Sequence, residues 1–312
     1  MKPVAAILIP THNSSAILDR TLISLNQSRH LDKFDIFVID NASTDDTRQV
    51  TAKHRKVSYM QLRKNFLMSK AINTAFRRLK IAEKYEYIII MAHDVMVNEV
   101  TLWNMYRFMT DNRSVSLAGP VAYNFNSNEV SSAGLSVNPF TSLLVHYLPI
   151  QQSVPVNHFA SAWIMKSSVF KEISGFDEIL FPMVFEEPDL GERLLRKGYK
   201  IDRCLTAYIW HPIYLDDRPS YEIIKKERIY SSSSKTYLFF RNRLLYMKKH
   251  AKSLHFPFFL FFIYPAVLIY YLPSVPLKYW RWTFQGIKDG LIYSLTKSKD
   301  YIRNKNNEIL YT

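Results

Sequence analysis

Three acidic motifs in this chain each begin where an apolar run ends, and this arrangement constrains the fold more than any other feature. They lie at residues 38–47, 91–95 and 185–190, and they contain Asp40, Asp94 and Glu187. Open α/β sheets bind their ligands at the carboxyl ends of buried strands, which is where such carboxylates would stand. The sequence therefore predicts an α/β fold with a ligand site at the carboxyl edge of its sheet.

The first 120 residues alternate apolar runs with amphipathic segments, and this rhythm predicts a Rossmann-like, mostly parallel sheet with helices on both faces. Residues 115–165 are rich in Asn, Ser and Pro and indicate loops with short strands. Further along the chain, Gly198 is expected to end the helix at 189–197. We expect strands at 4–10, 34–40, 57–62 and 86–91, and helices at 14–28, 44–54, 68–82, 167–173 and 189–197.

Composition allows one large domain or a domain with an appendage, because the chain has 312 residues and is 48% hydrophobic. We predict a catalytic domain over residues 1–215 and a C-terminal extension over 216–312. The single cysteine, Cys204, excludes an intramolecular disulfide and a multi-cysteine metal site, and it suits a reducing compartment. The apolar run 4–9 is too short for a signal-peptide core and is expected to be the first strand.

The extension carries most of the positive charge and a long uncharged segment. Residues 218–312 hold 17 Lys and Arg against 5 Asp and Glu, and residues 253–277 contain no charged side chain. Prolines interrupt that segment, and basic residues stand on both sides of it, which favours insertion into the cytoplasmic leaflet over a span. We therefore expect an anionic membrane surface as a partner and a location at the cytoplasmic face of the cell membrane. A single span and a buried helical hairpin are the alternatives.

Polar residues follow the first two strands. Small side chains and free N–H groups in the turn from Pro10 to Asn13 suit an anionic diphosphate at a helix entrance. The alternative is that Asn13 or Ser14 caps the following helix. For residues 43–46, the alternative is likewise a helix cap, with acidic side chains stabilised at a helix N-terminus.

Together the motifs resemble the family 2 inverting glycosyltransferases, which have the GT-A fold. The second strand ends in Asp-Asn-Ala-Ser-Thr-Asp-Asp-Thr (40–47), the fourth in Ala-His-Asp (92–94), and Phe-Glu-Glu-Pro-Asp-Leu (185–190) follows later, in the order of that family. Segments 237–245 and 285–291 extend the similarity over nearly the whole chain. The resemblance implies transfer of a sugar from a nucleoside diphosphate with inversion.

The resemblance implies a donor site built from several strand ends. Pro10, Thr11 and Asn13 would lie along the nucleotide, and Asp40 would accept a hydrogen bond from the pyrimidine ring. The donor would be dTDP-rhamnose or a UDP-sugar.

Three further positions match donor-binding segments of the family. Asn65 and Asn73 match its two asparagines, with Leu67 standing where a glycine is expected, so the backbone there should adopt a conformation that an L-residue tolerates. Arg241 lies in a Tyr-x-x-x-Arg-Asn segment, and its planar guanidinium suits a phosphate of the donor or of a lipid carrier.

The resemblance also implies a divalent cation, Mg²⁺ or Mn²⁺, because hard cations prefer oxygen ligands and can neutralise the charge on a leaving diphosphate. Asp94 matches the second carboxylate of the family's Asp-x-Asp, whereas Ala92 replaces the first. His211 matches a histidine that follows a later strand. We take Asp94 and His211 as the predicted metal ligands and His93 as a loop residue.

An inverting transfer needs one carboxylate to accept the proton of the attacking hydroxyl. Glu187 stands at the family's base position, which is ordinarily Asp, and like-charge proximity to Glu186 and Asp189 could raise a carboxyl pKa there. Asp189 is the alternative base. The other alternative is a group of acids that stabilises a helix N-terminus.

The leading prediction is a rhamnosyltransferase that acts on a cell-surface glycan or lipid-linked oligosaccharide in polysaccharide biosynthesis. A UDP-hexose transferase and an inactive scaffold with the same fold are the alternatives. Nucleic acid is not expected as a partner, because the positive charge adjoins an apolar aromatic run and matches no nucleic-acid motif.

Overall fold

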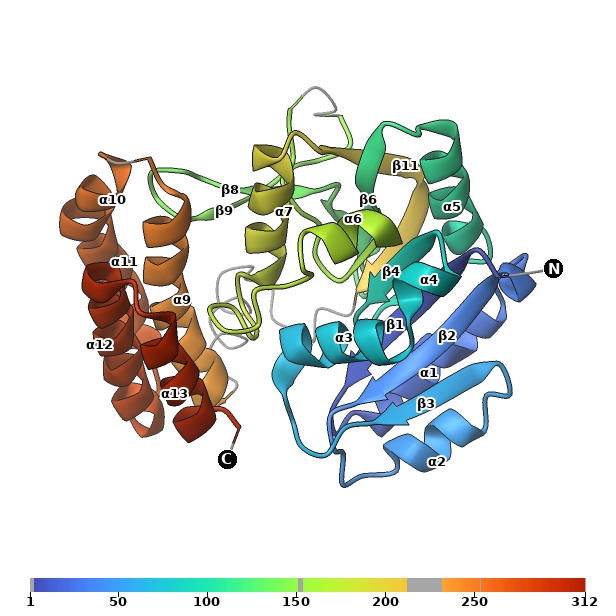
Figure 1. The fold of residues 1–312 in the computed structure, drawn as a ribbon, viewed down its shortest axis with the longest axis horizontal. Coiled ribbons are helices and arrows are strands. Elements are labelled where there is room, and N and C mark those ends of the chain that lie inside the picture. Colours follow the sequence, from blue (N-terminus) through green and yellow to red (C-terminus); the bar gives the residue numbers. More distant parts are fainter. Residues whose placement is uncertain (1–2, 151–153, 212–231, 253, 312) are drawn as a thin grey trace. The chain divides into compact units, whose positions relative to one another are not determined.

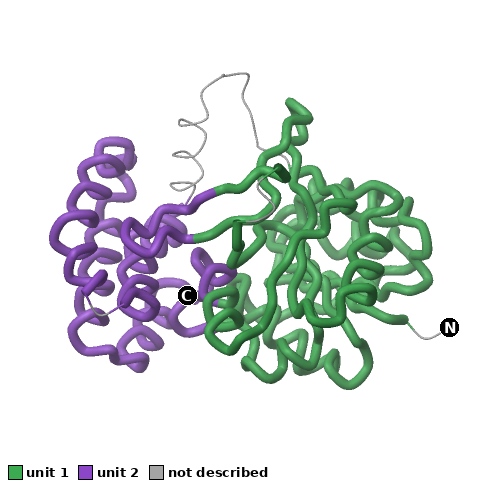
Figure 2. The backbone as a smooth tube through the Cα atoms, turned by 90° about the horizontal axis from the view of Figure 1, so that it is seen from above, with its two compact units in different colours: residues 1–136, 146–176, 190–213 green, residues 137–145, 177–189, 214–312 purple. Residues whose placement is uncertain are grey.

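The computed structural model describes residues 3–150, 154–211, 232–252 and 254–311. Contacts group the chain into two units (Figure 2): unit 1 comprises 1–136, 146–176 and 190–213, and unit 2 comprises 137–145, 177–189 and 214–312. Unit 2 thus takes up two earlier segments besides the C-terminal part of the chain. The division into a domain ending at residue 215 and an extension stays a prediction.

The strands and helices follow the expected alternation through the first part of the chain (Figure 1). In order they are β1 (Ala5–Thr11), α1 (Ser15–Asn26), η1 (Leu31–Lys33), β2 (Phe34–Asp40), α2 (Thr47–Ala52), β3 (Val57–Gln61), α3 (Leu67–Arg78), α4 (Ile81–Lys84), β4 (Tyr87–Met91), β5 (Met96–Val97), α5 (Thr101–Asp111), β6 (Val115–Asn124) and β7 (Val130–Ser132). They are followed by β8 (Leu135–Val137), β9 (Leu144–His146), β10 (Ala162–Lys166), α6 (Ser167–Glu172), α7 (Glu186–Arg196) and β11 (Lys200–His211).

The main sheet is mixed, with strand order β3-β2-β1-β4-β10-β6-β11-β5, and β7 pairs with β6. Its first four strands are parallel, and so are β6 and β11, whereas β10 runs antiparallel to both of its neighbours. The parallel half, β3-β2-β1-β4, is the predicted Rossmann-like portion. Strands β8 and β9 form a separate two-stranded sheet.

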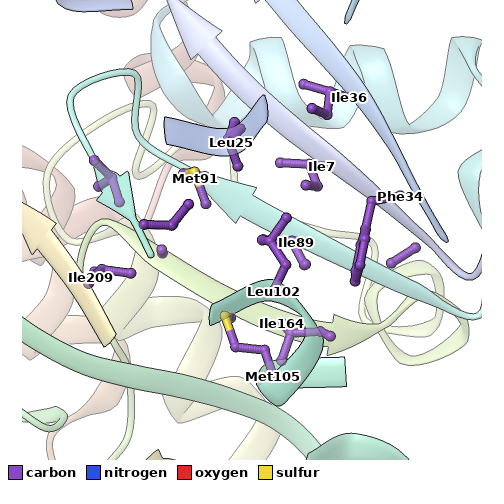
Figure 3. Packing of buried hydrophobic residues seen from close by; sticks show 14 of the residues in the cluster. Ile7, Leu25, Phe34, Ile36, Ile89, Met91, Leu102, Met105, Ile164 and Ile209 are labelled. Carbon is purple, nitrogen blue, oxygen red and sulfur yellow. The ribbon is translucent and has the colours of Figure 1, made fainter. Parts of the chain in front are cut away.

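Successive side chains of a strand point to opposite sides of the sheet, so the apolar strands give the main sheet two apolar faces. Helices cover both faces. On β1, Ala5, Ile7 and Ile9 belong to one apolar cluster, and Ala6 and Leu8 to another. The first cluster, part of which is seen in Figure 3, includes Leu18, Leu22 and Leu25 of α1 and Leu102, Met105 and Met109 of α5. The second includes Ile72 and Phe76 of α3, Val169 and Phe170 of α6, and Leu190 and Leu194 of α7.

The expectation of loops and short strands over 115–165 was wrong for β6, which has ten residues, the first seven of them buried. Gly119 and Pro120 look like strand breakers in the sequence, but both are accommodated. The ring of Phe159 occupies the place that a Cβ of Gly119 would take. Pro120 lies where β11 has an irregularity between Cys204 and Tyr208, so the missing N–H of the proline falls at a break in the ladder.

Unit 2 is mainly helical. Its elements beyond residue 231 are α9 (Ser233–His250), α10 (His255–Phe258), the π-helical turn η2 (Phe259–Ile263), α11 (Tyr264–Tyr271), η3 (Leu272–Ser274), η4 (Leu277–Tyr279), α12 (Trp280–Thr296) and α13 (Lys299–Ile309). Its apolar core joins Leu180, Phe181 and Phe185 to α9 through Leu244, Leu245 and Met247.

Two glycines bring α12 close to α9. A Cβ on Gly286 would lie 2.5 Å from the carbonyl oxygen of Tyr237, and one on Gly290 would lie 2.7 Å from Leu244. The first neighbour is backbone and cannot rotate away. Gly286 and Gly290, which lie in the segment 285–291 that resembles the family, therefore allow the close packing of the two helices.

We expect Gly286→Ala to lower the free energy of unfolding by about 1–3 kcal/mol, because the added methyl group forces the two helices apart. Urea unfolding followed by circular dichroism would measure this. Lys288→Ala, at an exposed position of the same helix, should change the value by no more than about 0.5 kcal/mol. Equal effects of the two substitutions would contradict the packing role.

Candidate active site

Several of the predicted site residues lie at the carboxyl edge of the parallel strands. Thr11 and Asp40 are the last residues of β1 and β2 and are partners in the register of the two strands. Strand β4, which pairs with β1 on the other side, ends at Met91 and leads directly into Asp94. Parallel pairing thus brings three separate parts of the sequence to one edge of the sheet.

Asp40 is 1% exposed and is held by two neighbours. Its Oδ1 accepts hydrogen bonds from the Ser43 amide (2.9 Å) and hydroxyl (2.5 Å), and its Oδ2 accepts one from the Tyr59 hydroxyl. Burial and this hydrogen bond raise the pKa of Tyr59, so the phenol keeps its proton and stays a donor. Because a carboxylate has about four acceptor sites, Asp40 can still accept a bond from a ligand.

The turn after β1 is tied to the loop after β2. Oδ1 of Asn13 accepts a hydrogen bond from the Thr44 amide (2.7 Å), and the Asn13 amide donates to the Ser43 hydroxyl (2.9 Å). Asn13 therefore does not cap α1. Ser14 occupies the N-cap position of α1, but its side chain makes no capping hydrogen bond. Instead, the Asp45 carboxylate accepts a hydrogen bond from the Ser15 amide (2.9 Å) at the start of the helix.

Asp45 is thus structural, as the helix-terminus alternative proposed. Burial raises its pKa, but hydrogen bonds from Thr47 and Ser15 lower it by more, and the net shift is downward. The carboxylate therefore stays ionised while it bridges the starts of α1 and α2.

The two predicted neighbours of Asn13 differ in exposure. Pro10 is partly exposed, whereas Thr11 is buried. The hydroxyl of Thr11 has no hydrogen-bond partner among the residues that the structure describes. A buried polar group of this kind at the sheet edge can bond a ligand.

The two predicted asparagines have different roles. Asn65 is partly exposed, and its side chain accepts from the Leu67 amide (2.9 Å). Leu67 has φ 58°, so the expectation of a backbone conformation that suits an L-residue was wrong, and the turn keeps the left-handed conformation that glycine adopts readily. Asn73 is buried, and it donates to the carbonyl of Phe176 (2.9 Å) and accepts from its amide (3.0 Å). Asn73 thus fixes the turn at Gly175, which favours a structural role.

A groove of about 700 Å³ lies beside this edge, lined by residues that include Ala42, Phe66, Arg63, Lys70 and Arg78. Its charged lining residues are all cationic. Such a lining favours a ligand that carries phosphate or other negative charge.

The structure brings the two predicted metal ligands together. Nε2 of His211, the last residue of β11, lies 3.3 Å from Oδ1 of Asp94, and the side chains are 20% and 14% exposed. Adjacent ligands of an octahedral ion with bonds of about 2.1 Å lie about 3 Å apart, so this pair fits one small divalent cation. Within the described ranges no group of three or more His, Cys, Asp or Glu could hold a metal. Further ligands would come from water or substrate.

The three predicted acids of unit 2 stand in the first turn of α7, which begins at Glu186, earlier than the expected residue 189. Glu187 is partly exposed, whereas Glu186 and Asp189 are buried. Asp189 pairs with Lys249 Nζ (2.6 Å) and His250 Nε2 (2.7 Å) of α9. Burial raises the pKa of Glu186 to about 7. Accessibility thus favours Glu187 as a base.

Lys249 also links Asp189 to Asp177, whose carboxylate is 2.9 Å from Lys249 and 3.1 Å from Lys299. Burial raises the pKa of Asp177, but its two lysine partners lower it by more. The segment that contains Asp177 therefore contributes an ion-pair network to unit 2.

The turn before α7 is strained and is held by α9. Val184 and Phe185 have φ 65° and 73°, which is costly for residues with bulky side chains. Nδ2 of Asn242 donates to the carbonyls of Met183 (2.9 Å) and Val184 (2.7 Å). Asn242 therefore positions the turn that leads to Glu187.

The prediction for Arg241 finds no support in this geometry. Its side chain is 0% exposed, and its guanidinium donates to the side chains of Asn242, Tyr237 and Asn306 and to the carbonyl of Leu180. A phosphate could approach only by displacing these acceptors. Arg241 is a core residue of unit 2.

The family model for glycosyl transferase family 2 matches residues 6–173, more than half of the chain. The chain belongs to glycosyl transferase family 2. Its α/β fold is of the GT-A type.

Two curated relatives of this family 2 protein carry specific names. The O-antigen chain rhamnosyltransferase WbaN of Salmonella anatum is 22% identical over 216 residues, which cover 67% of this chain and 66% of that protein. The poly(ribitol-phosphate) beta-N-acetylglucosaminyltransferase TarP of Staphylococcus aureus (strain N315) is 32% identical over 124 residues, or 38% of this chain and 36% of that protein. The chain therefore spans less than two thirds of the length of either relative.

Two solved structures share the fold of this family 2 protein. S. aureus TarS 1–349 in complex with UDP-GlcNAc has a TM-score of 0.52 at 16% identity, and the match covers 99% of this chain and 92% of that one. The mannosyltransferase PcManGT from Pyrobaculum calidifontis, in complex with GDP-Man and Mn²⁺, has a TM-score of 0.53 at 16% identity, covering 96% and 88%.

Sequence reasoning missed the residues of α9 that organise the acids. Lys249 and His250 pair with Asp189 across about 60 positions, and Asn242 holds the turn at Val184 across 58. The match of 237–245 to a family segment was the available signal. That match predicts that Arg241 binds a ligand, whereas the contacts show that the neighbouring Asn242 positions the turn.

We expect Glu186→Gln to flatten the dependence of stability on pH. The folded-state pKa of Glu186 is about 7 and its ordinary value is 4.5, so the folded protein binds the proton more tightly. The contribution of this group to the free energy of unfolding is full below pH 4.5 and is lost as the pH rises to about 7. Urea unfolding of wild type and variant at pH 5 and pH 7 would measure the difference.

The control is Glu308→Gln, whose carboxylate is largely exposed. This variant should keep the wild-type slope. A Glu186→Gln protein that loses as much stability between pH 5 and 7 as wild type would contradict the assignment.

Proposed function

We propose that this protein is an inverting, metal-dependent glycosyltransferase that moves a sugar from a nucleoside diphosphate to a cell-surface glycan or lipid-linked oligosaccharide. The observation that carries the proposal is the approach of Asp94 and His211 to 3.3 Å at the carboxyl edge where Asp40 also stands. Membership of family 2 supplies the reaction class.

Asp40 is the proposed contact to the nucleobase. Two neighbours hold its carboxylate at the end of β2, and it keeps acceptor capacity for a ring N–H. Thr11, with its buried hydroxyl, Asn13 and Pro10 are proposed to border the nucleotide. The cationic groove at Arg63, Lys70 and Arg78 is consistent with an anionic donor.

Mg²⁺ or Mn²⁺ is the proposed cation, held by Asp94 and His211. A carboxylate oxygen and an imidazole nitrogen suit Mn²⁺, and the PcManGT structure contains Mn²⁺ with its donor. A bound cation would neutralise the charge that develops on the departing diphosphate. Because Ala92 cannot be a ligand, the proposed site depends on His211 as the second protein ligand beside Asp94.

Glu187 is the proposed general base. Its carboxylate would take the proton of the acceptor hydroxyl while the hydroxyl oxygen forms a bond to C1 of the sugar. The bond from C1 to the diphosphate breaks on the opposite face, and both of its electrons leave with the nucleoside diphosphate. The burial of Glu186 and the pairing of Asp189 with Lys249 and His250 argue against these neighbours in this role.

Rhamnose from dTDP-rhamnose is the leading donor sugar, supported by the relative named as an O-antigen chain rhamnosyltransferase. A UDP-sugar is the second candidate, supported by the structural neighbour that contains UDP-GlcNAc. A thermal-shift panel of nucleoside diphosphate sugars with Mn²⁺ would separate them, because a ligand at 100 times its Kd adds about 2.7 kcal/mol to the free energy of unfolding. A catalytically inactive scaffold would release no nucleoside diphosphate from any of them.

We expect Asp94→Ala to weaken Mn²⁺-dependent binding of the nucleoside diphosphate by about tenfold or more, the scale seen when even an outer partner of a bound metal is lost. Titration calorimetry with and without Mn²⁺ would measure it. Asp111→Ala removes an exposed carboxylate of α5 and should leave the affinity unchanged. Full Mn²⁺-dependent affinity in the Asp94→Ala protein would refute the proposed metal site.

We expect Glu187→Gln to lower kcat by about 10²–10⁴ and to leave donor affinity nearly intact, because only proton transfer is lost. Release of nucleoside diphosphate from the donor found in the panel gives the rate, and calorimetry gives the affinity. Glu187→Asp should keep part of the rate.

The comparison variant is Asp189→Asn, which should lower stability because Lys249 and His250 would lose their carboxylate. A Glu187→Gln enzyme within about threefold of wild type, beside a folded but inactive Asp189→Asn enzyme, would assign the base to Asp189 instead.

A further inference from the structure

The helical run His255–Ser274 is apolar on every side. It is long and apolar enough to cross a membrane by length and composition, and 28% of its most apolar window is buried within the protein. Its inner side packs into unit 2 through a buried stripe: Phe256, Phe259, Tyr264, Val267 and Tyr271. Its outer side exposes Phe261 (71%), Phe262 (67%) and Ile269 (75%). A helix that is hydrophobic all round requires apolar surroundings on its outer side as well.

Helix α12 continues this apolar surface. Trp280, Phe284, Leu291 and Leu295 are exposed at spacings of 4, 7 and 4 residues, which place them along one side of a helix. The other side carries Gly286 and Gly290, which pack against α9. The outer stripe of α12 is therefore free of the packing that holds the helix in unit 2.

The charge around this surface has one sign. Exposed basic side chains occur before, within and after it, at Lys252, Lys278, Arg281, Lys288 and Lys297. The one acid between residues 254 and 298 is Asp289, which is buried and accepts hydrogen bonds from Tyr237, Tyr301 and Gln285. Residues 254–298 thus expose apolar and cationic groups without an anionic one.

We propose that the outer faces of His255–Ser274 and α12, the lipid-facing surface, insert into one leaflet of an anionic bilayer. Apolar side chains would enter the acyl region, while Lys278, Arg281 and Lys288 meet lipid phosphates. Tyr270 and Trp280 have the amphipathic rings that occur at the headgroup level.

The contacts of the run favour a leaflet over a span. The hydroxyl of Tyr264 donates to the carbonyl of Phe240 (3.0 Å), and the ring of Tyr271 lies 5.0 Å from that of Phe239. A spanning helix would lose these contacts with α9. Pro265 and Pro273 also fall within the run, and each removes a backbone donor.

Flotation of the full-length protein with vesicles tests the proposal. Binding is expected to phosphatidylcholine vesicles that contain phosphatidylglycerol, and to weaken by about fivefold for each of Lys278, Arg281 and Lys288 that is changed to Ala. The pair Phe261→Asp and Phe262→Asp should reduce binding by at least about tenfold, since charges would enter the acyl region. Both positions are exposed, so the variant should fold.

The matched control is Ile23→Asp, at a half-exposed apolar position of unit 1, which should bind vesicles as wild type does. Unchanged binding by the Phe261 and Phe262 variant would overturn the proposal. The proposal would also be overturned if the wild-type protein bound no vesicles and formed a dimer in light scattering that these substitutions dissociate. A second copy of the chain would then cover the surface.

Single cysteines placed at Lys252 and at Lys278 distinguish leaflet from span. The native Cys204 is buried and should not react with the label. Labelling of positions 252 and 278 from the same side of a sealed membrane supports the leaflet mode, and labelling from opposite sides refutes it. These measurements need no sugar transfer, so their outcome is independent of the proposed reaction.

Discussion

Backbone hydrogen bonding between the parallel strands β2, β1 and β4 is the constraint on which the candidate site depends. Parallel pairing in the observed register aligns the ends of these strands, with Thr11 opposite Asp40. Helices bury both faces of the sheet, so polar groups are confined to the loops that leave its edges. The nucleotide, metal and nucleobase contacts that we propose all belong to one such edge.

Loops at this edge adopt uncommon backbone conformations that specific contacts compensate. Asn13, Ala42 and Leu67 all have positive φ angles of 47–60°. Cross-links from Asn13 to Thr44 and from Asn65 to the Leu67 amide hold two of them. In unit 2 the same principle applies to Val184, whose carbonyl is bonded by Asn242. Strain of this kind persists where surrounding contacts over-determine the backbone.

Much of the parallel half of the sheet could be predicted from the sequence, because apolar period and local turn residues determine it. The family resemblance indicated both Asp94 and His211 as metal ligands, and the structure places them 3.3 Å apart. In contrast, β6 was missed because its accommodation of Gly119 and Pro120 depends on Phe159 and on the irregularity of β11, which are not local. The prediction that Arg241 binds a phosphate fails for a similar reason. A motif match gives the position of a residue in the sequence but does not show whether its side chain faces solvent or the core.

The three acids of α7 show how environment separates roles within a single helical turn. Asp189 pairs with Lys249 and His250 and has no exposed surface, so it serves as an anchor of this network. Glu186 is buried, and burial raises its pKa to about 7. Glu187, which lies between them in the sequence, keeps access to solvent. Because a base must reach its proton before its pKa matters, access is the ground on which we propose Glu187 among the three, with its longer side chain in place of the family's aspartate.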